Sequence, residues 1–402
     1  MHFRPILSAM FRNKTGAILV GLQIALTLAV VANAVFIIMQ RVEKIGRPSG
    51  IDSDNLIFVQ TYGYGPNYNH REAVRHDLDL IRSLPGVVAA SVTTSVPLSG
   101  GGGANSYRAT PEMNELDGVT GNYYEVDEQG VAAFGVKLSA GRAFNEDEIQ
   151  YSDVQNSQFG PSVIITEAMG EKLFGDEPAV GKTIYDSLGQ SAVVVGVIDH
   201  MLAAWVDWEN IENVIFLPKI APGPQTRYVV RAEPERSDGL VTEIERKLAE
   251  ADVTRAVTWV RPHSHFTERS YRADSRMIAL LSAIIVLMVA VTALGIVGLA
   301  SFYVNLRRKQ IGTRRAVGAR RVDILRYFML ENWLLTTGGV LLGTVLAFAF
   351  GQWLSAAYSL PRLAPHYVIV GVVLLWILGQ LAVYVPARRA AAIPPAIATR
   401  TV

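Results

Sequence analysis

The 402-residue sequence contains no cysteine, so any domain that it forms is held by its hydrophobic core and not by disulfides. Such a domain is compatible with the bacterial envelope. Charge is also scarce, because charged residues make up 18% of the chain and hydrophobic residues 50%. This balance is low in charge for a soluble protein and points to membrane-spanning segments.

Familiar catalytic patterns are missing as well. The sequence has neither a G-x-S-x-G elbow nor an H-E-x-x-H motif, which argues against the common serine hydrolases and the zincins. The segment Gly175–Thr183 resembles a phosphate-binding loop, but five residues instead of four separate its two glycines. His263 and His265 lack a third ligand at metal-site spacing. We therefore predict a non-catalytic chain with no metal and no cofactor of its own.

Four uncharged stretches of 26, 30, 30 and 25 residues interrupt the sequence. Each exceeds the roughly 20 apolar residues that a helix needs to cross a bilayer. The lack of charge within them disfavours ion-coupled transport, because such pumps need intramembrane ionisable groups. The predicted spanning helices occupy residues 15–40, 277–306, 327–361 and 362–387.

The N-terminal segment allows several interpretations. Residues 32–34, Ala-Asn-Ala, imitate a signal cleavage site, but the apolar run continues past them, so we expect the first span to remain uncleaved. Residues 1–14 place apolar side chains at helical spacing among basic ones, which predicts an interfacial amphipathic helix. A frayed start that only sets the topology explains these residues equally well.

Basic residues set the expected orientation. Residues 1–14, the loop 307–326 and the tail 388–402 together hold 14 of them, whereas the other short loop holds only Arg362. The positive-inside rule places both termini and the 307–326 loop in the cytoplasm, with residues 41–276 as a large domain on the far side. That segment has 22 basic and 34 acidic residues, which argues against a nucleic-acid partner.

The outer domain is expected to be mixed α/β. Apolar, β-branched runs predict strands and helical periodicity predicts two helices. The strands are predicted at 55–59, 87–96, 163–166, 192–198 and 214–217, and the helices at 71–84 and 239–251. The predicted fold class is a membrane protein with four transmembrane α-helices and a mixed α/β extracytoplasmic domain.

Small residues recur at every fourth position in two of the predicted spans. Such stripes let helix backbones approach closely. Packing within one protomer explains them as well as dimerisation does. The stripes are Gly21, Ala25 and Ala29 in the first span, and Gly339, Gly343, Ala347 and Gly351 in the third.

The loop at 307–326 carries the most specific pattern in the chain, Gln310-Ile311-Gly312, Arg314-Arg315 and Ala316-Val317-Gly318-Ala319. It resembles the signature R-x-x-E-I-G-x-R-x-A-x-G-A of the FtsX/MacB superfamily of ABC transporter permeases, the type VII or mechanotransmission class. Gln310 stands where these permeases usually have Glu. Glu331 is similar to the acid that they carry early in the third span.

The resemblance covers most of the chain. Tyr123-Tyr124, Gly141–Phe144, the run 163–184 and the strand at 193–197 are similar to the MacB-type periplasmic core domain, and residues 386–395 resemble the P-A-R-R-A…P ending of the permeases. The resemblance implies a permease of the bacterial inner membrane. We expect its ATPase to be a separate subunit, because cytoplasmic pieces of about 14, 20 and 15 residues cannot form one.

The partners implied are a cytoplasmic ABC ATPase dimer of the MacB or LolD type, which holds ATP and Mg²⁺, and a second permease protomer, identical or paralogous. Efflux of a substrate from the periplasm would add a membrane fusion protein and an outer-membrane channel. The alternative is an FtsX-type regulator of an extracytoplasmic partner such as a cell-wall hydrolase. A sensor receptor is disfavoured because no cytoplasmic output domain is evident.

The resemblance makes residues 307–326 a coupling helix that docks on the ATPase. The first two spans would act as transmission rods that continue as helices through Gln40–Ile45 and Glu268–Arg276. The resemblance implies that Gly312, Gly318 and Ala319 allow close backbone approach to the ATPase and that Ile311, Ala316 and Val317 make apolar contacts. Arg314 and Arg315 would pair with acidic residues. Gln310 replaces the usual Glu, so it would not make a charged contact.

Overall fold

The computed structural model describes residues 14–65, 68–112, 118–151, 159–358 and 361–394. They form two compact units, one from residues up to 46 together with those from 273 onward, and one from residues 47–272. The interfacial helix predicted at 1–14 lies outside the described residues apart from its last position, and so does the end of the chain beyond 394.

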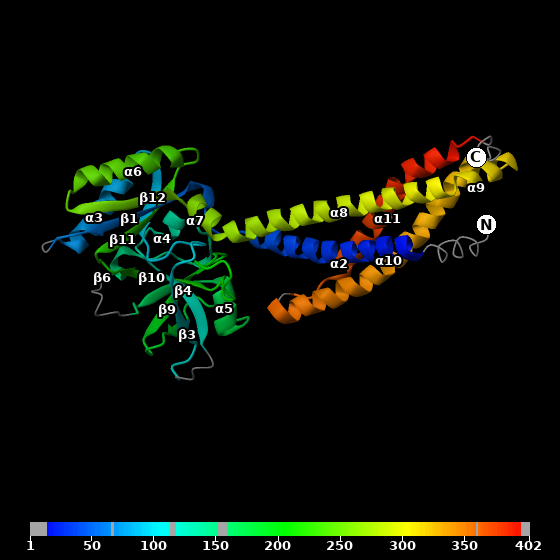
Figure 1. Cartoon of the computed structure of the whole chain (residues 1–402). Helices are drawn as coiled ribbons and strands as arrows, with labels where there is room; N and C mark the ends of the chain where they lie inside the picture. Colours follow the sequence, from blue (N-terminus) through cyan, green and yellow to red (C-terminus); the bar gives the residue numbers. More distant parts are fainter. Residues whose placement is uncertain (1–13, 66–67, 113–117, 152–158, 359–360, 395–402) are drawn as a thin grey trace. The chain divides into compact units, whose positions relative to one another are not determined.

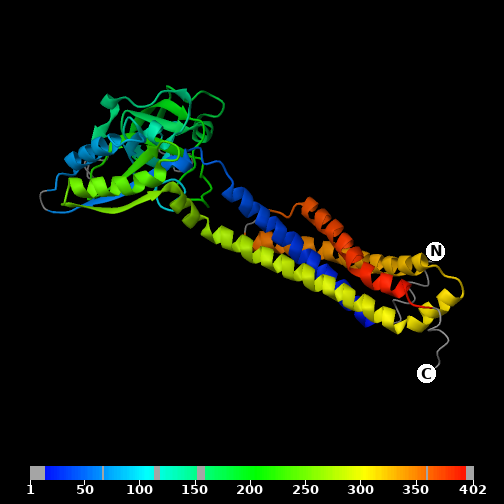
Figure 2. The same cartoon turned by 90° about the horizontal axis from the view of Figure 1, so that it is seen from above.

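Four long helices form most of the first unit, which we call the helical unit (Figure 2). They are α2 (Lys14–Ile45), α8 (Arg272–Leu306), α10 (Arg321–Tyr358) and α11 (Pro365–Ala391). Each is long and apolar enough to cross a membrane, which confirms the four predicted spanning helices. Non-helical residues 361–364 precede α11, where the sequence predicts the fourth span to have begun.

The two expected helical rods differ. Helix α2 runs without interruption to Ile45. The prediction of a continuous helix over 268–276 is wrong, because α7 (His263–Ser270) ends at Tyr271 and α8 starts anew at Arg272. Tyr271 is buried and has φ −90° and ψ 4°, outside the helical range. The second rod is therefore interrupted at this residue.

The two stripes of small residues face each other within one protomer. A Cβ atom added at Gly343 would lie 2.9 Å from both the Cα and the carbonyl oxygen of Ala25, and one at Gly339 would lie 2.9 Å from the carbonyl oxygen of Gly21. Asn33, which is buried, donates from Nδ2 to the carbonyl oxygens of Ala29 (2.8 Å) and Ala347 (3.0 Å). Intramolecular packing of α2 on α10 thus accounts for both stripes.

Residues 47–272 form the second unit, which we call the outer unit, and it contains two sheets (Figure 1). The four-stranded sheet is antiparallel, with the order β12 (Arg255–Pro262), β1 (Leu56–Gly63), β11 (Gln225–Ala232) and β2 (Val87–Val92). Helices α3 (His70–Arg82) and α6 (Ser237–Ala251) share one hydrophobic core with this sheet.

Alternation along β1 builds the two faces of this sheet. Ile57 and Val59 belong to the core beneath α3 and α6, whereas Phe58 points to the other face. There its ring lies 5.8 Å from that of His263 and 6.0 Å from that of Phe266, both on α7. The helix that precedes α8 is therefore packed on β1.

The eight-stranded sheet has a mixed topology and its own core, to which the short helix α5 (Glu167–Phe174) contributes. The other short helix, α4 (Gly130–Phe134), lies against β2 and β11 of the four-stranded sheet, and the Phe134 ring also contacts those of Tyr124 and Phe216 in the eight-stranded one. Residues 221–224 lead from β10 in this sheet to β11 in the other. Its main order is β3 (Gly103–Tyr107), β4 (Val119–Val126), β10 (Val214–Ile220), β7 (Ser162–Thr166), β9 (Ser191–Ile198) and β5 (Leu138–Gly141), with β6 (Gln150–Tyr151) on β10 and β8 (Thr183–Tyr185) on β9. The mixed α/β class predicted for this domain is confirmed.

Candidate partner-binding elbow

The chain turns back between α8 and α10 through residues 307–320, which we call the elbow. Arg307, at φ −98° and ψ 11°, separates α8 from the short helix α9 (Arg308–Ala316). The turn that follows requires Gly318, because its φ of +106° lies in the region that residues with a Cβ atom rarely adopt. The backbone N–H of Ala319 closes the turn by donating to the carbonyl oxygen of Arg314 at 3.0 Å.

The inner side of α9 is buried in the chain itself. Ile311 is only 4% exposed and Gly312 is buried beside it. Ile311 shares a hydrophobic cluster with Phe328 of α10 and Ala387 of α11. Ile311 therefore packs against α10 and α11 and is not free for the partner contact that the resemblance implies, whereas Ala316 and Val317 are exposed.

Arg307 joins the elbow to both neighbouring helices. Its Nη1 donates to Glu331 Oε2 at 3.0 Å and to the Tyr327 hydroxyl at 3.3 Å. Its guanidinium carbon also lies 5.2 Å from the ring centroid of Tyr303 on α8. The side chains of Arg307 and Glu331 are 17% and 10% exposed, so this ion pair is poorly hydrated. The sequence drew attention to Glu331 but not to its partner.

The two arginines predicted to meet acidic residues point to different surroundings. Arg315 donates from Nη1 to the carbonyl oxygen of Ala391 at 2.6 Å. Ala391 is the last residue of α11, and a cation is favourable there because the C-terminal end of a helix dipole is negative. Arg314 is exposed and lies over the ring of Tyr327, 5.1 Å from its centroid. Of the two, Arg314 is the one that presents its charge to solvent.

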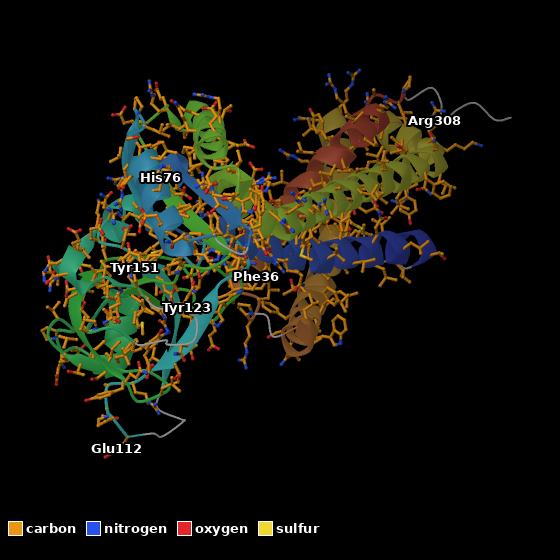
Figure 3. All side chains as sticks on the ribbon, turned by 90° about the vertical axis from the view of Figure 1, so that its left-hand side faces the viewer. Phe36, His76, Glu112, Tyr123, Tyr151 and Arg308 are labelled. Atoms are coloured by element: carbon orange, nitrogen blue, oxygen red, sulfur yellow. The ribbon has the colours of Figure 1, made fainter. Side chains whose placement is uncertain are left out.

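The tip of the elbow is apolar and unusually exposed. Val317 has 83% of its surface accessible, and Ala316 and Gly318 beside it are exposed too. Basic side chains surround this tip, and Figure 3 labels one of them, Arg308, at the end of the helical unit. The exposed basic residues are Arg308, Lys309, Arg314, Arg320 and Arg321. An apolar centre with a charged rim is typical of a protein-binding surface.

A small cleft of about 110 Å³ lies beside α9. Gln310 and Arg314 are exposed at its edge, and Arg307, Ile311 and Tyr327 also line it. The structure thus places Gln310 next to Arg314 at the edge of this cleft.

Two other motifs have structural roles within the outer unit. In Gly175–Thr183, the N–H of Gly181 donates to Val194 O at 2.8 Å and Lys182 pairs with Glu177, so this loop is bound to its own sheet. His263 is fully buried and its Nε2 donates to Pro97 O at 3.0 Å. Burial lowers the pKa of His263, which keeps the ring neutral.

Among the described residues, no three His, Asp or Glu side chains lie close enough to hold a metal ion. His265, the second histidine of the pair at 263 and 265, is half-buried, and its Nδ1 lies 3.4 Å from Arg261 Nη1.

At the opposite end of the helical unit, Asp274 joins α8 to α2. Its carboxylate is 3% exposed and accepts hydrogen bonds from Arg41 and from Lys44 Nζ, the latter at 2.9 Å. Both cations belong to the last two turns of α2. These ion pairs therefore join the ends of α2 and α8 that lead into the outer unit.

Inside the outer unit, residues 200–206 form an anchoring loop that binds the segments next to both helices. Three hydrogen bonds join this loop to the segment after α2. His200 Nε2 donates to Pro48 O at 2.8 Å, and the N–H of Leu202 donates to Ser49 O at 3.0 Å. Arg47 Nη2 donates to Val206 O at 2.9 Å. The turn at 97–100 is held by Leu98 and Gly100, which donate to Ala203 O (3.1 Å) and Ala204 O (2.8 Å). Because His263 of α7 donates to the same turn, the anchoring loop connects the segments that flank α2 and α8.

Comparisons with known proteins agree with this architecture. Residues 23–260 match the MacB-like periplasmic core domain, and residues 282–395 match the FtsX-like permease C-terminal domain. The macrolide export ATP-binding/permease protein MacB of Chromobacterium violaceum is 27% identical over 341 residues, which cover 78% of this chain and 48% of the relative. The corresponding protein of Neisseria meningitidis serogroup A is 25% identical over 362 residues, covering 86% and 52%.

The crystal structure of the periplasmic region of MacB from Actinobacillus actinomycetemcomitans is 16% identical, with a TM-score of 0.36, and covers 56% of this chain and 97% of that one. The chain spans about half the length of the curated relatives it matches. Because the periplasmic core domain matches more than half of the chain and the FtsX-like domain follows it, the chain belongs to the family of MacB-like ABC transporter permeases.

Proposed function

We propose that this permease subunit uses ATP hydrolysis by a partner ATPase dimer to move its outer unit and so drive a substrate out of the periplasm. In this proposal the elbow is cytoplasmic, the outer unit is periplasmic and the helices cross the bacterial inner membrane, in agreement with the distribution of basic residues. ATP and Mg²⁺ belong to the partner ATPase. A membrane fusion protein and an outer-membrane channel would carry the substrate onward.

The exposed tip of the elbow is the observation that carries this proposal. A valine that is 83% exposed on a turn with a left-handed glycine is poorly explained by the stability of this chain alone. Val317 can enter an apolar pocket on the ATPase while Arg314 and the surrounding cations meet acidic side chains at its rim. Since Ile311 and Arg307 fix α9 to the helical unit, a push on the tip reaches α8 and α10.

The route to the outer unit follows from the same contacts. Helix α8 starts at Arg272 and leads directly to the elbow, and its first turn is tied to α2 through Asp274. The anchoring loop then holds the segments next to both helices. A shift of α8 would therefore be passed to both connections of the outer unit.

A second permease protomer is part of the proposal. Large apolar side chains of α8 remain exposed, among them Leu280 (62%), Val286 (69%) and Leu294 (70%). Lipid or a helix of another protomer covers such side chains in a membrane.

The test replaces Val317 by Asp in the chain reconstituted in nanodiscs with its ATPase subunit. We expect the stimulation of ATP hydrolysis by the permease to fall about tenfold or more, as for a buried contact residue at an interface. Val253→Asp is the matched control, because Val253 is 82% exposed and lies in the outer unit. Equal stimulation by the wild type and Val317→Asp would contradict the docking role of the elbow.

A further inference from the structure

The outer unit holds a cleft of about 220 Å³ where its two sheets meet. β10 of the eight-stranded sheet ends at this cleft and β11 of the four-stranded sheet begins there. The end of β4 supplies Glu125, and the end of β2 with the residues after it supplies Thr93 and Thr94. Residues from both sheets therefore line one open space.

Three charged side chains line this cleft, and two of them neutralise each other. Lys219 Nζ lies 3.3 Å from Glu125 Oε1, and the two side chains are 10% and 12% exposed. Burial raises the pKa of Glu125, while the nearby Lys219 opposes this increase. The pair contributes no net charge to the cleft.

The described hydrogen-bond partners of Arg227, the third charged residue, are neutral. Its Nε donates to Gln60 Oε1 at 2.9 Å and its Nη1 to Thr94 O at 3.0 Å. In the described part of the chain no carboxylate forms an ion pair with it, and burial lowers its pKa. The lining thus has one positive charge in excess, inside a segment that has 22 basic and 34 acidic residues.

A partly desolvated cation without a counter-charge is costly, and folded proteins normally compensate it with an acid or with a bound anion. The planar guanidinium matches the two oxygens of a carboxylate or a phosphate. The space is large enough for such a group, because a water molecule takes about 30 Å³ of liquid volume. Threonine hydroxyls at 93 and 226 add neutral hydrogen-bonding groups to the lining.

We propose that this cleft binds the carboxylate or phosphate group of a small ligand, with Arg227 and Lys219 as its cationic contacts. The ligand would touch β11 in one sheet and β10 in the other, and would thereby stabilise one arrangement of the two sheets. The site goes beyond the proposed coupling to an ATPase and does not depend on it, because binding concerns the permease chain alone.

The test uses the purified full chain in nanodiscs, without any ATPase. Sodium phosphate and sodium acetate are titrated separately in isothermal titration calorimetry and in thermal unfolding, with sodium chloride at equal ionic strength as the reference. We expect saturable binding and a raised unfolding temperature with at least one of the two anions. The anion that saturates identifies the chemistry, phosphate or carboxylate.

Arg227→Gln should weaken this binding about tenfold or more, since a charged hydrogen-bond donor is lost. Arg246→Gln is the matched control, because Arg246 is exposed on α6 and pairs with Glu250. Ala221→Leu fills the cleft without changing any charge and should also abolish binding, which separates the site from a folding defect in the arginine variant. The proposal is overturned if neither anion binds saturably, or if Arg227→Gln and Ala221→Leu both bind as the wild type does.

Discussion

Helices α2 and α8 both lead into the outer unit, but the helical unit holds them very differently. In the most apolar 18-residue stretch of α2, 50% of the residues are buried, whereas in that of α8 only 11% are buried. Helix α2 is packed against the glycine-containing face of α10, whereas α8 meets α2 through a few separate contacts such as Thr27 with Thr292. The difference indicates a rigid group of α2, α10 and α11, and a more weakly held α8 that leads to the elbow.

The physical basis of this difference is backbone distance. Close backbone approach brings many atoms into dispersion contact along a whole helix, and these small energies add up. A side-chain hydrogen bond or ion pair acts at one point and is lost when the helix shifts by an ångström or two. Helix α8 can therefore move on α2 at a smaller cost in free energy than α10 can.

The largest effect is expected for Gly343→Leu. A Cβ atom at this position would lie 2.9 Å from the backbone of Ala25, so α2 and α10 must separate. Overpacking of this kind costs about 1–3 kcal/mol or more. Thermal unfolding in detergent should show a clear loss of stability. Gly338→Leu on the same helix is the control, because its Cβ would meet nothing within 4 Å, and an equal loss in both variants would contradict the tight α2–α10 contact.

The sequence alone predicts much of this helical unit, for physical reasons that can be named. An uncharged stretch long enough to cross a bilayer must satisfy its backbone hydrogen bonds internally, which predicts a helix. The helices α2, α8, α10 and α11 are predicted in this way. Small residues at every fourth position predict close packing, but not which helix is the partner. That information lies in the fold, because Gly343 and Ala25 are far apart in the sequence.

The elbow was predicted only in part. Val317 and Gly318 lie at its exposed tip, as expected for a docking segment, whereas Ile311 is turned inward. Ile311 is the only large apolar residue of α9, so it is the one side chain that this short helix can bury against its neighbours. The inward position of Ile311 can therefore be predicted from the sequence. The contact of Arg315 with Ala391 and the cleft at Arg227 join distant segments and leave no local pattern.

The second effect in size is expected for Asp274→Asn, which tests the weaker contact of α8. Asn keeps the shape of the side chain but removes the charge that Arg41 and Lys44 share, at a cost of about 1–3 kcal/mol. The ends of α2 and α8 should then separate more often. The natural chain has no cysteine, so disulfide formation between single cysteines placed in the last turn of α2 and the first turn of α8 reports this directly.

Glu43→Gln is the control for this experiment, because Glu43 is exposed in the same turn of α2. Crosslinking should slow in Asp274→Asn and stay unchanged in Glu43→Gln. Equal crosslinking in both variants would mean that the ion pairs do not hold α8 to α2.

A smaller, pH-dependent effect is expected at α7, the helix before α8. Burial lowers the pKa of His263, so below the usual pKa of about 6.5 the unfolded chain binds a proton that the folded chain does not. Stability of the outer unit should therefore fall as the pH decreases through 6.5. Other buried groups act in the opposite sense, since burial raises the pKa of Asp127 to about 6.

A difference measurement isolates the histidine. His263→Gln keeps a donor for Pro97 O but cannot titrate, so its unfolding temperature should drop less than that of the wild type between pH 7 and pH 5. His76→Gln is the control, because His76 is exposed on α3. Parallel pH profiles for the wild type and His263→Gln would show that protonation of His263 does not loosen α7.

The smallest effect is expected from the hydrogen bond between Thr27 and Thr292, whose hydroxyl oxygens are 2.7 Å apart and buried between α2 and α8. Interhelical hydrogen bonds in membranes contribute about 0.6 kcal/mol on average. A double-mutant cycle with Thr27→Val and Thr292→Val, measured by thermal unfolding, should give a coupling of this size, because valine keeps the volume and removes only the bond. A coupling as large as the loss from Gly343→Leu would mean that α8 is fixed as firmly as α10, and the elbow would then have to move the four helices as one body.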